Sequence, residues 1–300
     1  MTMYSIKSDG LNEIHERPFK LEREIQNIFE SNLEEIMGLK MVRSEFSIKN
    51  KRIDTLAYDE QANAFIIIEY KRDRNSSVVD QGFTYLGLML ENKADFVLEH
   101  QGQLGSSIKV DDIDWSQSRV AFVSPSFTEN QVQATNFGDI AIELWEVKRY
   151  ANDTVAINAI RKSKSAPSIK PLAQKNSDLK AISDVIKVFT EEDHRAAASE
   201  EIFELYENFR DAILNLSDGI EIKPQKHYVA FKKDGNIACI ELQRKKIKIY
   251  IGLKVGQLDD AKNISKDVSQ VGHFGTGDYL VEVNSDESIE YIMSLIKQAI

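Results

Sequence analysis

The chain has 300 residues, of which 42% are hydrophobic and 29% are charged, and its formal net charge is −10. This length favours two domains, and the acidic balance argues against a protein that holds nucleic acid by bulk electrostatics. A single cysteine, Cys239, excludes an internal disulfide and a Cys-rich zinc site, and no apolar run approaches the roughly 20 residues that span a bilayer. We therefore expect a cytoplasmic protein with no membrane partner.

The first strong pattern is an amphipathic helix. Residues 1–17 are polar and mixed and carry no motif. From Pro18 to Met37 the apolar residues recur at spacings of three and four, with proline near the start and Gly38 at the end, which predicts one helix. Its first turns carry two acidic residues, Glu22 and Glu24. A strand is expected next, over residues 41–48.

Two strands that form a hairpin are predicted to follow, over residues 52–58 and 65–68, with the polar segment 59–63 as their turn. The second strand is short, β-branched and unbroken, as in a strand buried on both faces. Because side chains alternate along a strand, Glu69 and Lys71 should share one face while Tyr70 points to the other. The hairpin would bring Asp54 near Glu69.

A pair of neighbouring carboxylates indicates a metal site. Two such groups repel each other unless a cation lies between them, and oxygen ligands with room for water suit Mg²⁺ or Mn²⁺. A lysine beside the metal can orient an attacking water and offset charge that builds on a phosphate. The alternative is a salt bridge at a strand end, which contributes little to stability.

A strongly apolar helix is predicted over residues 78–90, where Gln81 and Tyr85 are four apart and hence on one face. Packing alone would not predict glutamine at position 81. Helices over 94–103 and 128–135 and strands over 119–124 and 140–147 complete an alternating pattern. The first half is therefore expected to be a mixed sheet flanked by helices.

Together these residues resemble the PD-(D/E)xK nuclease superfamily, within it the mismatch-type and Mrr-like endonucleases. The resemblance covers roughly residues 18–100 and rests on three motifs: Arg52-Ile53-Asp54, Glu69-Tyr70-Lys71 and Gln81-x-x-x-Tyr85. The one departure is Ile53, where the family name has proline. The fold that the resemblance implies is a restriction-endonuclease-like sheet within an α/β (α+β) protein.

The resemblance also implies roles for the site residues. Asp54 and Glu69 would be metal ligands, the carbonyl of Tyr70 a further ligand, and Lys71 the catalytic lysine. Gln81 and Tyr85 would support the site and the scissile phosphate. The family often adds an acidic residue from its first helix. Here we favour Glu22, with Glu24 as the alternative.

The second half begins after a change of composition. Residues 161–178 are rich in Lys, Ser and Pro, which predicts a linker between a domain over 1–160 and another over 179–300. Helices are expected over 179–189, 199–216 and 288–300, and strands over 228–232, 237–242, 247–253 and 279–283. This is an α+β domain with an antiparallel meander. It resembles an uncharacterised domain sometimes labelled a predicted transport protein, which implies no chemistry.

Closely spaced glycines occur between residues 267 and 278. Such glycines let backbone N–H groups approach a phosphate, but the strand, lysine and helix of a phosphate loop are absent here. Tight turns before the strand at 279–283 are the favoured interpretation.

The expected function is a Mg²⁺- or Mn²⁺-dependent endonuclease that hydrolyses DNA in restriction, antiviral defence or repair, a setting that rests on the resemblance alone. Two basic segments could form a rim for the phosphates: Lys49, Lys51 and Arg52, and Lys71, Arg72 and Arg74. Cuts on both strands would most simply need a homodimer. The 179–300 domain would then serve recognition or oligomerisation. The alternative is a non-catalytic protein that binds nucleic acid or protein and regulates on a nuclease-like scaffold.

Overall fold

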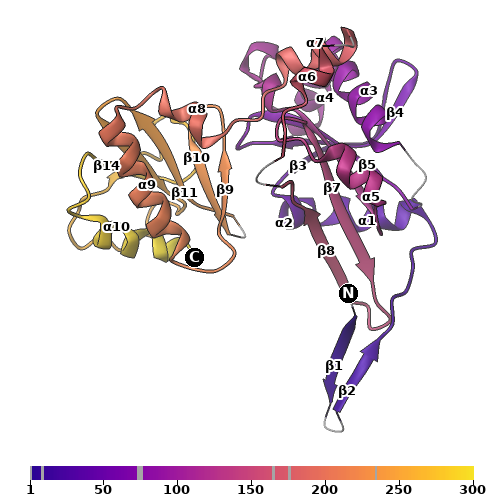
Figure 1. Ribbon diagram of the computed structural model, residues 1–300, viewed down its shortest axis with the longest axis horizontal. Coiled ribbons are helices and arrows are strands. Elements are labelled where there is room, and N and C mark those ends of the chain that lie inside the picture. The colour runs from indigo at the N-terminus through magenta and orange to yellow at the C-terminus, as the bar shows by residue number, and fades with distance from the viewer. Residues whose placement is uncertain (1, 8–9, 73–76, 164–165, 175–176, 234) are drawn as a thin grey trace. The chain divides into compact units, whose positions relative to one another are not determined.

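The computed structural model describes residues 2–7, 10–72, 77–163, 166–174, 177–233 and 235–300. Contacts within the chain define two compact units, Met1–Val188 and Phe189–Ile300, which Figure 1 draws with labelled elements. The division falls ten residues later than the predicted boundary at 178/179. The reason is that Ile169, Ile182 and Ile186, in and after the predicted linker, are buried in the core of the first unit.

A six-stranded mixed sheet forms the centre of the first unit, in the order β3-β4-β5-β6-β7-β8. Its strands are β3 (Lys40–Ile48), β4 (Lys51–Asp59), β5 (Ala64–Tyr70), β6 (Arg119–Ser124), β7 (Ile142–Arg149) and β8 (Val155–Ile160). The β4 and β5 strands form the predicted hairpin, and β6 lies parallel to both β5 and β7. Every residue of β5 is buried, as its uninterrupted apolar run predicts.

Helices cover both faces of this sheet. They are α1 (Glu22–Ser31), α2 (Leu33–Met37), α3 (Val78–Glu91), α4 (Lys93–Leu104), α5 (Glu129–Thr135), α6 (Lys170–Ala173) and α7 (Ser177–Val185), with 3₁₀ turns η1 (Val110–Asp112) and η2 (Trp115–Gln117). Ile66 and Ile68 of β5 pack in one core with α1, whereas Phe65 and Ile67 pack in the other with α3 and α4. Alternation along one strand thus separates the two cores.

Two elements near the amino terminus differ from the sequence prediction. The single helix expected over residues 18–37 is divided, because the Asn32 side chain donates to the carbonyl of Ile28 at 2.8 Å and closes α1. The sequence predicted no helix or strand before residue 18. The structure has a hairpin there, of β1 (Met3–Lys7) and β2 (Gly10–Ile14), which Figure 1 shows extending beyond the ends of β7 and β8. Each of its strands has only five residues, which is too short for a clear periodic signal.

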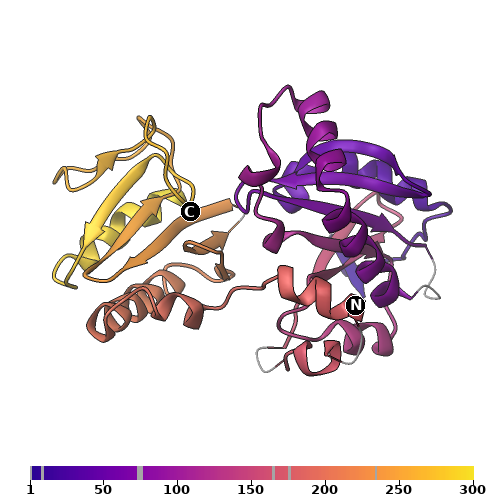
Figure 2. The same cartoon turned by 90° about the horizontal axis from the view of Figure 1, so that it is seen from above.

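The second unit is an antiparallel sheet with helices on one face, and Figure 2 shows α9 along that face. Its elements are α8 (Glu191–Arg195), α9 (Glu200–Leu214), β9 (Glu221–Pro224), β10 (Val229–Lys233), β11 (Gly235–Gln243), β12 (Lys246–Ile251), β13 (Lys266–Asp267), β14 (Tyr279–Val283), α10 (Ile289–Ile296) and η3 (Lys297–Ala299). The predicted meander β10-β11-β12 is confirmed. Together with the mixed sheet of the first unit, this meander confirms the predicted α/β (α+β) fold class.

Among the described helices, none is long and apolar enough to cross a bilayer.

The glycine-rich segment lies against the face of this second sheet that α9 does not cover. A Cβ at Gly275 would lie 2.8 Å from Cys239 Cβ, and a Cβ at Gly277 would lie 1.9 Å from the carbonyl oxygen of Ile251. Gly277 also has φ +111°, which L-residues rarely adopt. The glycines therefore serve close packing of backbone on the sheet.

We expect Gly277→Ala to lower the free energy of unfolding by about 2–4 kcal/mol, because its methyl group would overlap a strand carbonyl that has no room to move. Urea unfolding followed by circular dichroism would measure the change. Gly272→Ala is the matched control, since a Cβ there would have no neighbour within 4 Å. Equal stabilities of the two variants would contradict this account.

Candidate active site

The carboxylates of Asp54 and Glu69 meet across the β4–β5 hairpin. The paired part of the hairpin ends at Thr55↔Ile68, which places Asp54 and Glu69 one step further along the two strands. The backbone N–H of Asp54 donates to Oε1 of Glu69 at 3.2 Å, and that of Tyr70 donates to Oδ2 of Asp54 at 3.0 Å. Two acidic side chains are thus held together where a buried strand ends.

Burial makes the charged forms of both acids unfavourable. Desolvation, followed by the charge of Asp54, raises the pKa of Glu69 to about 7, against a smaller opposing effect of Lys71. Desolvation also raises the pKa of Asp54, although the N–H of Tyr70 and the charge of Lys71 act against it. A cation between the two would offset their mutual repulsion and favour the ionised form of both.

Three further predicted residues converge on Glu69. The Lys71 ammonium lies 3.2 Å from Oε2, and the Gln81 amide of α3 donates to the same oxygen at 3.1 Å. Gln81 Nε2 is also 3.3 Å from the Tyr85 hydroxyl, which donates to the carbonyl of Arg52 at 3.3 Å. The structure therefore brings Asp54, Glu69, Lys71, Gln81 and Tyr85 into one connected group.

The side chain and the main chain of Tyr70 lie in different environments. Its side chain lies on the opposite face of the sheet, in the core with α1, where its hydroxyl is 3.3 Å from Thr55 Oγ1. Its main chain belongs with the strand end that carries the two acids, because its N–H donates to Asp54 Oδ2 at 3.0 Å. Its carbonyl is the group named by the resemblance.

The acids of the first helix differ in position. Glu22 accepts the backbone N–H of Arg72 at 3.0 Å, directly after β5, and its charge contributes to the raised pKa of Asp54. Glu24 instead accepts the backbone N–H groups of Lys20 and Leu21 at the start of α1. Glu24 thus satisfies backbone donors at the start of α1, whereas Glu22 has the contact near the end of β5.

Sequence reasoning missed a polar ridge on α1. Gln26, nearly fully buried, donates to the carbonyl of Asp54 at 3.1 Å and to Glu30 at 3.0 Å. Glu30 in turn accepts the hydroxyl of Thr55. Glu22, Gln26 and Glu30 are spaced by four residues, so helical periodicity could have placed them on one face. The ridge fixes the β4 backbone at Asp54.

Glu45 of β3 is a second residue that was missed. It lies opposite Asp54, between the pairs Ser44↔Thr55 and Phe46↔Ile53. Its φ of 54° is left-handed, a conformation that costs a non-glycine residue about 1–3 kcal/mol. Its carboxylate is 2.8 Å from Arg52 Nε, and its charge also raises the pKa of Asp54. No sequence signal marks this conformation.

Two acidic side chains, those of Asp54 and Glu69, adjoin each other at the candidate metal site, which is few for a site whose ligands all come from the protein. Within the described ranges, no group of three or more His, Cys, Asp and Glu side chains is arranged to hold a metal ion. Two carboxylates, a main-chain carbonyl and waters are nevertheless a common set for Mg²⁺, which retains several waters. The residues present therefore fit Mg²⁺ or Mn²⁺. Arg74 of the predicted basic rim lies outside the described residues.

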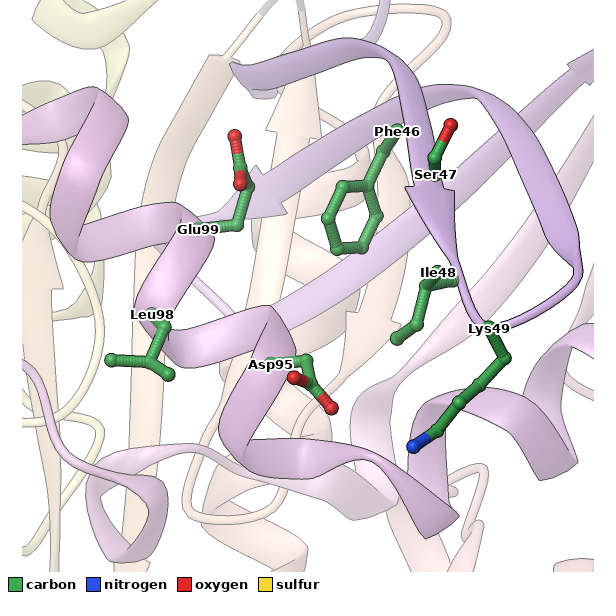
Figure 3. Close-up of a pocket in the computed structure, with 7 residues that line it drawn as sticks. All are labelled: Phe46, Ser47, Ile48, Lys49, Asp95, Leu98 and Glu99. Carbon is green, nitrogen blue, oxygen red and sulfur yellow. The ribbon is translucent and has the colours of Figure 1, made fainter.

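A groove of about 440 Å³ lies elsewhere, between the end of β3 and α4. Figure 3 shows Phe46 and Ile48 reaching from the strand toward the helix that carries Leu98. The lining residues are Phe46, Ser47, Ile48, Lys49, Asp95, Leu98 and Glu99. None of the predicted catalytic residues lines it, so the groove and the carboxylate site are separate features.

A protein of Haemophilus influenzae, described as an uncharacterized protein, is 53% identical to this chain over 300 residues, covering 100% of the chain and 99% of that protein. The chain belongs to the family of this protein. A family model described as a domain of unknown function (DUF5655) matches residues 191–300, which lie within the second unit. That description contains no transport label.

Two solved structures overlap with parts of the chain. A repair endonuclease from Pyrococcus abyssi matches at 18% identity and a TM-score of 0.24, over 43% of this chain and 48% of that one. The EndoMS–dsDNA2 complex matches at 17% identity and a TM-score of 0.29, over 48% of this chain and 60% of that one. Both matches span less than two thirds of the solved chains, and at these TM-scores neither carries an argument about this protein.

Proposed function

We propose that the chain is a metal-dependent endonuclease that hydrolyses the phosphodiester backbone of DNA. The observation that carries the proposal is the pair of adjoining acids, the half-buried Asp54 and the buried Glu69, which both have raised pKa values, with the Lys71 ammonium 3.2 Å from Glu69. A structural salt bridge needs only one carboxylate. Two desolvated acids beside one lysine are costly for folding and are typical of functional sites.

Asp54 and Glu69 would hold Mg²⁺ or Mn²⁺, with the carbonyl of Tyr70 as a further ligand and Glu22 as the acid from the first helix. When bound, the divalent ion would supply Lewis acidity to the phosphate and favour deprotonation of the attacking water. Glu22 is exposed and already accepts the N–H of Arg72, so its contribution requires the carboxylate to rotate.

The remaining side chains have roles that follow from their contacts. Lys71 would exchange its contact with Glu69 for the attacking water or a phosphate oxygen, where its charge offsets the negative charge of the transition state. Gln81 holds the Glu69 carboxylate in one orientation. Tyr85 fixes Gln81 and the Arg52 carbonyl, and so connects α3 to β4.

DNA is the proposed substrate because the motif resemblance implies it and because basic residues adjoin the site. Lys51 and Arg52 begin the strand that carries Asp54, and both are exposed. A local basic rim can bind phosphates although the net charge is −10. Restriction, antiviral defence or repair would be the biological setting, in the cytoplasm, with the second unit as the recognition or assembly module.

Metal binding and a cleavage panel test the proposal. Calorimetry should show Mn²⁺ or Mg²⁺ binding at millimolar or lower concentrations, with Asp54→Ala reducing affinity at least about 10-fold. Plasmid, single-stranded, mismatched and modified DNA would then be incubated with each ion, and strand scission measured. Glu34→Gln is the matched control for a carboxylate outside the site. Absence of binding, with and without DNA, would favour the non-catalytic scaffold.

A further inference from the structure

Among the described residues, the hydrogen bonds that join the β1–β2 hairpin to the first unit lie at its base. The base is held by the backbone of β7 and the turn after it: Arg17 N–H donates to the Arg149 carbonyl at 2.7 Å, and Ala151 N–H donates to the His15 carbonyl at 2.9 Å. The hairpin then extends away from the sheet (Figure 1). An isolated two-stranded hairpin is marginal in water, so this one needs a partner to be firmly ordered.

One face of the hairpin is apolar and exposed. In the register Ile6↔Leu11 and Tyr4↔Glu13, these four side chains share a face. Ile6 is 87% exposed, Leu11 68% and Tyr4 51%. Three large apolar side chains on one small face form a patch that is unfavourable in water and typical of a contact surface.

The slightly negative charge of residues 2–17 argues against nucleic acid and anionic lipid as partners of the hairpin. Residues 2–17 contain two basic residues and three acidic ones, and the apolar face itself carries Glu13. A segment that binds nucleic-acid phosphates or anionic lipid would need the opposite balance. The remaining class of partner is a protein surface.

The sequence of β1 is complementary to itself. Within the described residues, β1 pairs with β2 alone, so its other edge has unused backbone groups. If two copies pair antiparallel along this edge about a two-fold axis at Ser5, Tyr4 of one copy lies opposite Ile6 of the other. Pairing through β2 would instead place Leu11 opposite Glu13. Cross-strand apolar pairs stabilise a sheet, whereas the second arrangement gains no such contact.

We propose that the hairpin is a dimerisation arm, in which β1 pairs with β1 of a second copy of this chain to form a four-stranded sheet. Four strands exceed the minimum for independent stability, and Tyr4 of each copy would pack against Ile6 of the other. The contact is smaller than the roughly 800 Å² per partner of standard interfaces, so dissociation constants on the order of 10 µM are expected. The proposal concerns self-association alone and is independent of DNA cleavage.

Cysteine cross-linking tests the pairing directly. Ser5→Cys should give a disulfide-linked dimer on mild oxidation, since both copies of position 5 lie at the axis. Asn12→Cys is the matched control, because position 12 faces Ser5 within one hairpin and its two copies would be about 14 Å apart. The native Cys239 is buried and does not interfere. Equal cross-linking of the two variants would overturn the proposal.

Sedimentation equilibrium without metal or DNA provides the second measurement. Between about 1 and about 100 µM the parent chain should change from mostly monomer to mostly dimer. Ile6→Glu should weaken the dimer at least about 10-fold, because it places like charges near the axis. Leu98→Glu, at an exposed apolar position of α4, should not. A parent chain that stays monomeric, or an Ile6→Glu chain that dimerises equally well, would refute the proposal that the hairpin is a dimerisation arm.

Discussion

Lys71→Ala is expected to abolish Mg²⁺-dependent cleavage, with a loss of at least about 10³-fold, while the chain folds as before. The lysine forms an ion pair with Glu69, the more deeply buried of the two acids. Removing it leaves Glu69 without a counter-charge, and a carboxyl group with an already raised pKa then stays protonated instead of unfolding the chain. Asp54→Ala should cause a similar loss, because it removes one of the proposed metal ligands.

Plasmid nicking under single-turnover conditions, with circular dichroism to verify the fold, would measure both effects. Lys109→Ala is the matched control, because Lys109 is exposed and lies outside the site. Undiminished cleavage by the Lys71→Ala protein would rule out the assigned site. A loss of activity shared by Lys109→Ala would indicate general charge effects instead.

Glu69→Gln is expected to stabilise the metal-free protein at neutral and higher pH. The folded-state pKa of Glu69 is raised from 4.5 to about 7, so between these values the folded chain binds more protons than the unfolded chain. Stability of the parent chain should therefore fall as pH rises from about 4.5 to about 7, and remain lower above that. The glutamine variant lacks this charge and should be more stable at pH 8 by about 1–3 kcal/mol.

Urea unfolding at about pH 5 and about pH 8, in chelator and in Mn²⁺, would measure this linkage. At the lower pH the two chains should differ little, because Glu69 is then protonated in the folded parent. Mn²⁺ should stabilise the parent and not the variant. A variant that is less stable than the parent at pH 8 would show that ionised Glu69 stabilises the fold, contrary to the raised pKa. Exposed Glu34 supplies the control substitution Glu34→Gln.

Much of the site was predictable because it is local in sequence. Asp54 and Glu69 belong to one hairpin whose apolar second strand is unmistakable, and Gln81 and Tyr85 follow on the next helix. Strand alternation and helical spacing then fix which side chains share a face. The contacts around Glu69 agree with those expectations. What each residue does there stays a proposal.

Other features depend on information that periodicity does not contain. Glu45 has a left-handed backbone at its place opposite Asp54 in the β3–β4 pair, and residue type alone gives no indication of it. The predicted linker was polar overall, yet Ile169 within it is buried in the core of the first unit, as is Ile182 just after it. A few apolar residues in a polar segment are enough to dock it, and composition averages conceal them.

The complete burial of β5 has a consequence for how the chain responds to ions. A strand in the middle of a sheet, covered on both faces, exposes its amides to hydrogen exchange only when the whole unit opens. The charge of Glu69 therefore acts on the global opening equilibrium, whereas an acid on a frayed edge would affect only local motion. An ion that neutralises Asp54 and Glu69 would slow exchange throughout the first unit, and its loss would leave the entire unit more prone to open.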